Sequence, residues 1–518
     1  MIAGILAQDL PDAPVIEWAE ISPILVVLGA AVLGVLVEAF VPRRLRYPVL
    51  LGLSFVAVVA ALALVVWLSG TQIVAVEGSV AVDGPALFIQ GTVLVLSAVS
   101  LLTFAERRLE SGGDAFTPAA SALPGSEDER VLTQQRVLQT EVYPLTLFAI
   151  GGMLLFPAAN DLLTMFVALE VLSLPLYVLC AMARRRRLLS QEAAMKYFLL
   201  GAFSSAFFIF GSALVYGYAG SMRFSAIDSA LASRVGAEGL LLAGVGLLAV
   251  GLLFKVSAAP FHAWTPDVYQ GAPTPVTGFM AACTKLAAFG ALLRVFYVAL
   301  GGLRTDWQPM LWAVAILTML LGSVVALTQT DVKRMLAYSS IAHAGFIITG
   351  MVAADAVGTA SVLFYLAAYG FTTVGAFAVV TLVRDAGGEA THLAKWAGLG
   401  KRSPVVAATF ALFLLAFAGI PLTSGFIGKL AVFSAAIEAG AVSLVVVGLV
   451  ASAIAAFFYV RVIVIMFFSE PAAEGPSVAV PSVLTSAAIA VGALATVVLG
   501  ILPGPLLTLA EQAAVFVR

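Results

Sequence analysis

Long apolar stretches, separated by short polar segments, run along the chain from residue 23 to residue 507. A helix crosses the hydrocarbon core of a bilayer with about 20 apolar residues, whereas a membrane barrel shows shorter, alternating segments. The pattern therefore predicts an all-α, polytopic membrane protein. We expect about fourteen transmembrane helices over residues 23–41, 48–68, 84–105, 143–158, 161–183, 193–219, 239–258, 275–300, 309–328, 335–354, 359–383, 404–438, 442–468 and 481–507.

The order of these helices predicts two copies of one unit. Helices four to eight and nine to thirteen form two sets of five helices, and the sets have nearly equal length. Because five is odd, the second set must enter the membrane from the opposite face, which gives an inverted repeat of the kind seen in many ion transporters. The expected divisions are three N-terminal helices at 1–105, a cytoplasmic linker loop at 106–142, a first five-helix repeat at 143–300, a second at 301–468 and a C-terminal helix at 469–518. The polar, Gly- and Pro-containing loop at 106–140 is expected to be a flexible linker.

Proline interrupts the fourth helix of each unit, which predicts broken helices seven and twelve. Pro260 lies in FKVSAAPFHAW and Pro421 in AGIPLTSGFIGK. A proline removes one backbone N–H and clashes with the carbonyl four residues earlier, so these two should free the carbonyls of Val256 and Phe417. Unpaired carbonyls at membrane depth persist only beside protein or water. A simple kink is the alternative for each proline, but two matching breaks, each near a lysine, favour a functional role.

Composition supports a membrane location and excludes several classes of protein. The 518 residues are 62% hydrophobic and 11% charged, with a mean hydropathy of +1.07, whereas a soluble chain is roughly 45–50% apolar and about 25% charged. The 27 Lys and Arg and 29 Asp and Glu could not cover a soluble globule of this size. This excludes a cytosolic enzyme, a nucleic-acid-binding protein and a disordered chain.

Cofactor and metal motifs are not evident in the sequence. The two cysteines, Cys180 and Cys283, cannot build an iron–sulfur cluster or a disulfide framework. The sequence has no Walker loop, no dinucleotide fingerprint and no His, Cys and carboxylate cluster with metal-ligand spacing. We therefore expect no cofactor and no metal on this chain.

The distribution of basic residues predicts the orientation. About seventeen Lys and Arg fall in one set of alternate loops and about four in the other, so the positive-inside rule places both termini outside. The run Arg184–Arg187 is interpreted as a topology anchor. Residues 1–20 carry Asp9, Asp12, Glu17 and Glu20 but no Lys or Arg, so they are not expected to be a signal peptide.

Ionisable side chains inside the predicted helices are the main functional candidates, because each costs about 2.5–3.5 kcal/mol near the bilayer centre. Glu170 lies nine residues into the fifth helix, roughly 13 Å deep. Lys285 is near the middle of the eighth helix, and Lys429 lies in the second half of the broken twelfth helix. A structural hydrogen bond is the alternative for each.

Four other basic residues lie nearer to helix ends. Lys255 precedes the first break by five residues. Lys196 is a few residues inside the sixth helix and could extend to the membrane surface. Arg294 and Arg461 are within two turns of helix ends, and we expect both to snorkel in this way.

Spaced lysines with a glutamate, hydroxyls and water between them can form a proton relay. Burial lowers the pKa of a lysine and a nearby carboxylate raises it, so its protonation responds to neighbouring charges; arginine remains charged. His343, amid Ser339 and Ser340, titrates near neutrality and could link the two halves, although a core histidine is the alternative. His262, with Asp267 nearby, follows the first break and is expected to be structural.

Four stretches, which contain the lysines and the histidines His262 and His343, resemble a known family, the subunit N family of bacterial NADH–quinone oxidoreductase, or respiratory complex I. They are residues 195–220, 254–290, 331–346 and 419–429. The family belongs to the antiporter-like proteins, which are related to the large subunits of Mrp-type cation/proton antiporters. TPDVYQGAPTP in place of an LPDA-type motif favours subunit N over its sister subunits L and M, as does the lack of a long lateral helix after the fourteenth span.

The resemblance implies fourteen helices, two inverted five-helix units, and half-channels joined by a central charged axis. Matched position by position, it assigns proton-transfer roles to Glu170, Lys196, Lys255, Lys285, His343 and Lys429. The residues expected to support them are Pro260, His262, Asp267 and Pro421. Glu170 and Lys255 would form an ion pair that opens and closes, shifting the proton affinity of Lys285.

The resemblance also implies a function and a setting. Quinone reduction elsewhere in the complex would drive proton translocation through this chain in the bacterial plasma (inner) membrane. NADH, FMN, iron–sulfur clusters and the quinone would be bound by other subunits. The expected partners are the antiporter-like subunit M and the small membrane subunits. The alternatives are a subunit of an Mrp-type cation/proton antiporter and a structural subunit that does not pump.

Overall fold

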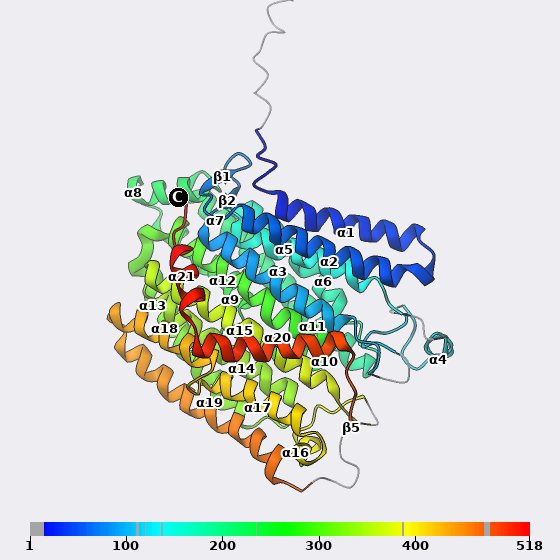
Figure 1. Cartoon of the computed structure of the whole chain (residues 1–518). Coiled ribbons are helices and arrows are strands. Elements are labelled where there is room, and N and C mark those ends of the chain that lie inside the picture. The colour runs from blue at the N-terminus through cyan, green and yellow to red at the C-terminus, as the bar shows by residue number, and fades with distance from the viewer. Residues whose placement is uncertain are drawn as a thin grey trace, which may run out of the picture.

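The computed structural model describes residues 15–109, 113–119, 121–135, 138–234, 236–385, 388–470 and 477–517. Asp9 and Asp12, used in the signal-peptide prediction, lie outside these ranges. The described residues form a bundle of long helices with roughly parallel axes (Figure 1). Helices α1 and α2 lie at one edge of this bundle, and α19 lies at the opposite edge (Figure 1).

The N-terminal part consists of three helices and one short hairpin. In chain order they are α1 (Ser22–Phe40), α2 (Arg43–Trp67), β1 (Ile73–Ala75), β2 (Val80–Val82) and α3 (Gly84–Phe104). The strands pair antiparallel, with Ile73 opposite Val82. Helix α3 begins where Asp83 accepts a hydrogen bond from the backbone N–H of Ala86 at 3.1 Å, an N-terminal cap.

The part that corresponds to the first predicted unit contains the first interrupted helix. Its elements are α5 (Val142–Leu155), η1 (Phe156–Ala158), α6 (Leu162–Cys180), α7 (Arg187–Ala219), α8 (Phe224–Ser233), α9 (Glu238–Lys255), α10 (Trp264–Gly271), α11 (Thr274–Phe279), the π-helical η2 (Met280–Thr284), α12 (Lys285–Arg294) and the π-helical η3 (Val295–Ala299). Eight residues without regular structure separate α9 from α10.

The remaining part contains the second interrupted helix. Its elements are η4 (Gly301–Leu303), α13 (Arg304–Leu327), α14 (Val332–Met351), α15 (Ala356–Leu382), β3 (Val383–Asp385), β4 (Gly388–Glu389), η5 (Leu393–Trp396), α16 (Leu399–Arg402), α17 (Pro404–Ala418), α18 (Ser424–Glu438), α19 (Val442–Phe468), β5 (Ser477–Val478), α20 (Val483–Ile501) and α21 (Gly504–Gln512). Strand β3 pairs antiparallel with both β4 and β5, with Arg384 opposite Glu389.

The predicted membrane class is confirmed. Each of the fourteen predicted segments coincides with a helix or an interrupted helix. Within the described residues, 11 helices are long and apolar enough to cross a membrane, and two shorter apolar helices, Val142–Ala158 and Pro404–Ala418, accompany them. The count of fourteen spans and the inverted repeat remain predictions.

Burial separates central helices from peripheral ones. The most apolar window of Thr274–Ala299 is 100% buried and that of α15 is 94% buried, whereas that of α20 is only 28% buried. A polar group on the central helices is therefore surrounded by protein. Lys285, on α12, is in this position.

The described residues of the 106–140 segment, where we expected a flexible linker, pack against the rest of the chain. The segment contains a short helix, α4 (Glu127–Gln134), and it packs against the arginine run before α7. Asp114 pairs with Arg184 at 2.6 Å, and Glu129 pairs with Arg187 at 2.9 Å. Two of these arginines are therefore buried in ion pairs with carboxylates that lie 70 and 58 residues away in the sequence. The run thus does more than anchor the topology.

Arg294 was expected to snorkel, and this prediction is wrong. Its side chain is fully buried and pairs with Asp83, also fully buried, at 2.6 Å. Its Nε donates to the carbonyl of Pro157 at 2.6 Å. The Asp83 carboxylate also accepts from the backbone N–H of Val517 at 3.0 Å. A counter-charge and a carbonyl thus replace water around Arg294. Arg461 is exposed, and its expected snorkelling remains a prediction.

Candidate functional site

At the first helix break, the carbonyl of Phe254 accepts from the backbone N–H of Ser257 at 3.1 Å and also from a tryptophan side chain. Helix α9 ends at Lys255, five residues before Pro260. The indole Nε1 of Trp264, the first residue of α10, donates to the carbonyl of Phe254 at 3.0 Å. Pro260 was expected to free the carbonyl of Val256, but the indole of Trp264 binds the carbonyl of Phe254 instead. Helix α9 already ends at Lys255, before the position at which Pro260 by itself would interrupt it.

Lys255 lies in an aromatic cage. Its side chain is buried, and its ammonium donates to the hydroxyl of Tyr197 at a long 3.5 Å. The Nζ atom lies 5.2 Å from the ring centroid of Tyr197 and 5.7 Å from that of Tyr177. Tyr197 in turn stacks on Trp264, with centroids 4.6 Å apart. Ring faces attract the cation and replace part of its hydration.

Glu170 and Lys255, the predicted ion pair, are not paired in this structure. Glu170, on α6, accepts a hydrogen bond from the Ser205 hydroxyl of α7 at 2.5 Å. Among the described residues, no nitrogen of Lys255 lies within 4.0 Å of the Glu170 carboxylate. The two groups therefore have separate partners.

Lys196 lies in an ion-pair network at one end of α7. It pairs with Glu192 at 2.7 Å and with Asp267 at 2.8 Å, and its side chain is 43% exposed. Asp267 also pairs with Arg334 of α14 at 2.5 Å. The structure thus brings Asp267 directly to Lys196 and connects both to the part of the chain after residue 301. The expected extension of Lys196 to the membrane surface remains a prediction.

Lys285 is held by a neighbouring helix. It is the first residue of α12, directly after the π-helical η2, and its side chain is buried. Its ammonium donates to the carbonyl of Ser340 at 2.5 Å and to the Ser340 hydroxyl at 2.7 Å. Short π-helical segments inside helices are frequent at functional sites. Ser340 lies on α14, so Lys285 joins two of the central helices.

His343 occupies the middle of a hydroxyl network on α14. Its Nδ1 forms a hydrogen bond with the Tyr365 hydroxyl at 2.8 Å, and its Nε2 forms a longer one with Tyr459 at 3.4 Å. Tyr459 also forms a hydrogen bond with the hydroxyl of Ser339. The two tyrosines come from α15 and α19 and were missed in the sequence, because single tyrosines in apolar runs are typical of core residues.

Lys429 binds the carbonyls of the second helix break. Helix α17 ends at Ala418, and Gly419 adopts a left-handed conformation with φ of 82°. The Lys429 ammonium donates to the carbonyl of Phe417 at 3.1 Å, to that of Ala418 at 2.9 Å and to Ser452 at 2.7 Å. The carbonyl of Phe417, which Pro421 was expected to free, therefore accepts a hydrogen bond from Lys429. A Cβ at residue 419 would lie 2.9 Å from Lys429 Cδ, so glycine leaves room for this side chain.

The candidates thus form separate groups. Lys285 of α12 contacts Ser340, and His343 lies on the same helix as Ser340, α14, where Ser339 and Ser340 adjoin each other. Lys429 and Lys255 each have their own surroundings. His262 lies at the first break, and its Nδ1 has no hydrogen-bond partner in the described structure. The described residues contain no group of three His, Cys, Asp or Glu that could hold a metal.

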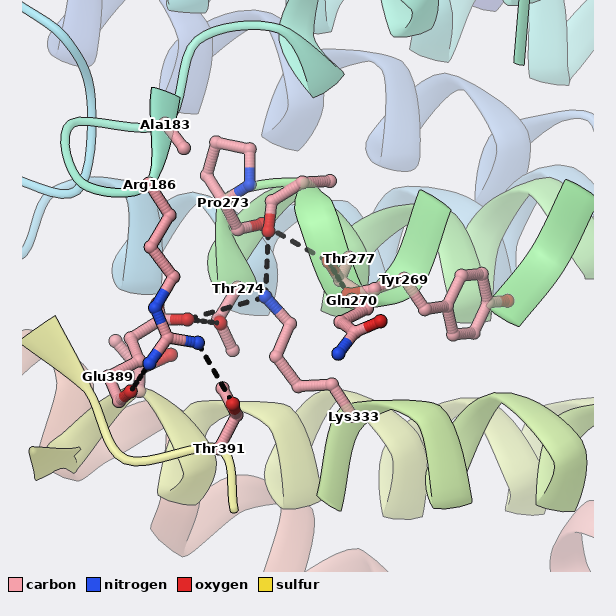
Figure 2. A network of polar contacts seen from close by, with 12 residues as sticks. Ala183, Arg186, Tyr269, Gln270, Pro273, Thr274, Thr277, Lys333, Glu389 and Thr391 are labelled. Atoms are coloured by element: carbon pink, nitrogen blue, oxygen red, sulfur yellow. Dashed lines mark hydrogen bonds and ion pairs between the residues drawn. The ribbon is translucent and has the colours of Figure 1, made fainter. Parts of the chain in front are cut away.

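One polar network had no counterpart among the predictions (Figure 2). Lys333 of α14 donates to the carbonyl of Ala272 at 2.7 Å and pairs with Glu389 of β4 at 3.3 Å. Glu389 also accepts from the Thr274 hydroxyl at 2.6 Å. In the sequence, Lys333 counted only as one of the loop charges that set orientation. Its partner lies 56 residues away, which no local pattern indicates.

Comparison with known proteins agrees with this architecture. The family described as "NADH:quinone oxidoreductase/Mrp antiporter, TM" matches residues 159–455. NADH-quinone oxidoreductase subunit N of Rhodococcus opacus is 64% identical over 99% of both chains. NADH-quinone oxidoreductase subunit N 3 of Streptomyces griseus is 63% identical over 98% of this chain and 95% of its own.

Solved structures share the fold. A chain of respiratory complex I from Thermus thermophilus with bound Aureothin superposes with a TM-score of 0.76 and 33% identity, covering 94% of this chain and 99% of its own. A chain of the Mrp complex from Dietzia sp. DQ12-45-1b gives a TM-score of 0.77 at 22% identity over 96% and 97%, a likeness of fold alone. The chain therefore belongs to the NADH-quinone oxidoreductase subunit N family, the antiporter-like membrane-arm subunits of complex I.

Proposed function

We propose that this chain translocates protons through Glu170, Lys196, Lys255, Lys285, His343 and Lys429, driven by quinone reduction on other subunits of the complex. The observation that carries the proposal is the contact of Lys285 with Ser340, beside the hydroxyl network of His343, inside the most buried helices of the bundle. Such costly polar groups at the centre of a membrane protein indicate a pathway for ions or protons.

The central step would transfer a proton along α14. The Lys285 ammonium would donate its proton toward the Ser340 hydroxyl, from which it would pass by way of Ser339 and Tyr459. His343 would accept this proton on Nε2 and release the one on Nδ1 to Tyr365. Ordered water would bridge the gaps between these groups and carry the proton from Tyr365 to Lys429.

The input to this step would be a rearrangement of charge near Lys255. The long hydrogen bond of Lys255 and the separate partner of Glu170 fit an open state of their ion pair. Closing and reopening such a buried pair is comparable in free energy with moving one charge across 100 mV, about 2.3 kcal/mol. Lys196 and Asp267 would exchange protons with the aqueous phase, because both are partly exposed.

The proposed setting follows from the relatives. The chain would lie in the bacterial plasma membrane with both termini outside, beside the antiporter-like subunit M and the small membrane subunits. It would contribute to a translocase in which NADH, FMN, iron–sulfur clusters and quinone bind other subunits. Pro260, Pro421 and His262 would support the pathway by maintaining the two helix breaks.

The test is proton translocation by the whole complex in proteoliposomes. Lys285→Ala, Lys255→Ala and Glu170→Ala should each assemble but lower the number of protons moved per NADH, because proton transfer through this chain should slow roughly tenfold, which corresponds to about 1.4 kcal/mol in the transfer step. Glu470→Gln is the control, because this carboxylate forms an exposed ion pair with Lys401. Wild-type stoichiometry in all three variants would contradict the proposal and support a structural subunit.

The second candidate function is cation/proton antiport. It is favoured by the matched family, whose description includes Mrp antiporters, and by the shared fold of the Dietzia chain. The same proteoliposomes distinguish the two functions. Proton translocation that does not change between sodium-free and sodium-containing buffer supports the main proposal. A requirement for sodium supports antiport.

A further inference from the structure

Glu389 connects the first turns of two helices that carry the proposed pathway (Figure 2). Its carboxylate accepts from the Thr274 hydroxyl at 2.6 Å and pairs with the Lys333 ammonium at 3.3 Å. Thr274 is the first residue of α11, and Lys333 is the second residue of α14. One side chain from a third element, β4, therefore ties the starts of both helices together.

The position of Glu389 is itself fixed on both sides. Arg186, at the start of α7, donates to the carbonyl of Glu389 at 3.1 Å and to the hydroxyl of Thr391 at 3.0 Å. The carbonyl of Thr391 accepts from the backbone N–H of Val332 at 2.7 Å. The hairpin that carries Glu389 is thus attached to the beginnings of α7 and α14, so the carboxylate has little freedom to move.

We call Glu389, Lys333 and Thr274 together the clamp. It contains one carboxylate, that of Glu389, and one ammonium, that of Lys333, which form an ion pair. Lys333 is almost fully buried, and the Ala272 carbonyl satisfies it together with Glu389. Burial alone would raise the pKa of Glu389, but the ammonium of Lys333, the hydroxyl of Thr274 and the positive charge of Arg384 together outweigh it, so the pKa lies below its ordinary value. Glu389 is therefore ionised at neutral pH, and its contribution is lost only as the pH falls through that lowered pKa.

Farther along, α14 contacts the continuation of α11, where Ser340 meets Lys285 of α12. Ser340 follows Lys333 by seven residues on α14, roughly 10 Å along the axis. Helix α11 leads through the π-helical η2 into α12, which begins with Lys285. A π-helical segment departs from the regular hydrogen-bond pattern, so the placement of Lys285 depends on what holds α11 against its neighbours.

We propose that Glu389 is a positioning residue, which sets the contact between Lys285 and Ser340 by clamping the first turns of α11 and α14. This inference rests on the proposed function, because it concerns the efficiency of proton transfer from Lys285. Loss of the clamp changes how the Lys285 ammonium is aligned with the Ser340 hydroxyl. It does not remove either of these two residues. A displacement of about 1 Å between reacting groups can reduce a rate by up to about 10²-fold.

The test uses three variants of the whole complex in proteoliposomes: Glu389→Gln, Lys333→Gln and the double variant. The measurement is protons moved per NADH oxidised, normalised to assembled complex, because a purely structural defect changes the amount of complex and not this ratio. Each single variant should lower the ratio roughly threefold. The double variant should recover most of the loss, because two amides can pair without a lone buried charge. Wild-type ratios in both single variants would overturn the inference.

Thr274→Val serves where Glu389→Gln does not assemble. It removes the hydrogen bond to α11 and leaves the ion pair with Lys333 intact. A reduced proton ratio in this variant supports the clamp, and a wild-type ratio overturns it. Glu470→Gln is the matched control, because it neutralises a carboxylate of an exposed ion pair, and its ratio should equal that of the wild type.

Lys285→Ala, measured in parallel, separates this inference from the proposed function. If Lys285→Ala lowers the ratio and Glu389→Gln does not, the positioning role is wrong and the proposed pathway stands. If Lys285→Ala itself has the wild-type ratio, the proposed pathway is wrong, and the positioning role falls with it.

Discussion

The two helix breaks have the same local features but solvate their lysines in different ways. At the second break, three oxygen atoms surround the ammonium of Lys429, two of them carbonyls that the break has freed. At the first break, the indole of Trp264 donates to the carbonyl of Phe254. Lys255 forms one long hydrogen bond and lies beside two aromatic rings. A proline and a nearby lysine therefore do not determine how the charge is stabilised.

This difference indicates which lysine responds to its surroundings. Carbonyl oxygens are strong acceptors that stabilise the charged form of Lys429 in one place. Aromatic rings attract a cation more weakly and with less directional preference. Lys255 is therefore better suited to exchange partners when Glu170 moves, and Lys429 is better suited to hold a proton at a fixed position.

The largest expected effect is a difference in thermal stability between a variant of Lys429 and the matching variant of Lys255. Lys429→Met leaves the carbonyl of Phe417 buried without its side-chain donor, which costs about 1–3 kcal/mol. It leaves the carbonyl of Ala418 with only the long hydrogen bond from Ser452, at 3.5 Å. Lys255→Met removes a buried cation with a single long hydrogen bond and should leave stability unchanged or higher. Thermal denaturation of the purified complex, followed through this subunit, measures both. Equal losses in the two variants would remove the distinction between the breaks.

An intermediate effect is expected from the tryptophan of the first break. Trp264→Phe removes the indole donor of the Phe254 carbonyl, at a cost of about 1 kcal/mol, and weakens the stack that holds Tyr197 beside Lys255. Trp307→Phe is the matched control, because its indole also donates to a buried backbone carbonyl, that of Leu300, at 2.9 Å, outside both breaks. Both variants should lose similar stability, but only Trp264→Phe should lower the protons moved per NADH. A lowered ratio in the control as well would show that the effect does not come from the cage.

The smallest expected effect concerns two serine hydroxyls. Ser452→Ala leaves Lys429 with its two carbonyls, so stability should fall by less than about 1 kcal/mol and proton translocation should remain near the wild-type level. Ser205→Ala removes the hydroxyl that donates to Glu170. It should reduce translocation more than Ser452→Ala does, in the same proteoliposome measurement. The opposite order would indicate that Lys429 is the more sensitive group.

Much of the fold could be predicted because its determinants are local. Apolar runs long enough to span a bilayer, together with two prolines, indicated the helices and both breaks. Lys285 and Lys429 are buried, as their positions within apolar segments suggested, and Lys255 is buried although it lies near a helix end. Their roles in proton transfer remain predictions. The expected snorkelling of Arg294 was wrong, because its partner Asp83 lies 211 residues away in the sequence.

The sequence by itself thus determined the membrane environment, the approximate helix boundaries and the presence of titratable groups among apolar ones. Only the tertiary structure decided which oxygen atoms and rings surround each group: the aromatic cage of Lys255, the tyrosine partners of His343 and the clamp of Glu389. Hydrophobicity and backbone restrictions act within a few residues, so a single chain segment reveals them. A hydrogen bond between distant segments depends on how whole helices pack, and that packing is a property of the complete fold.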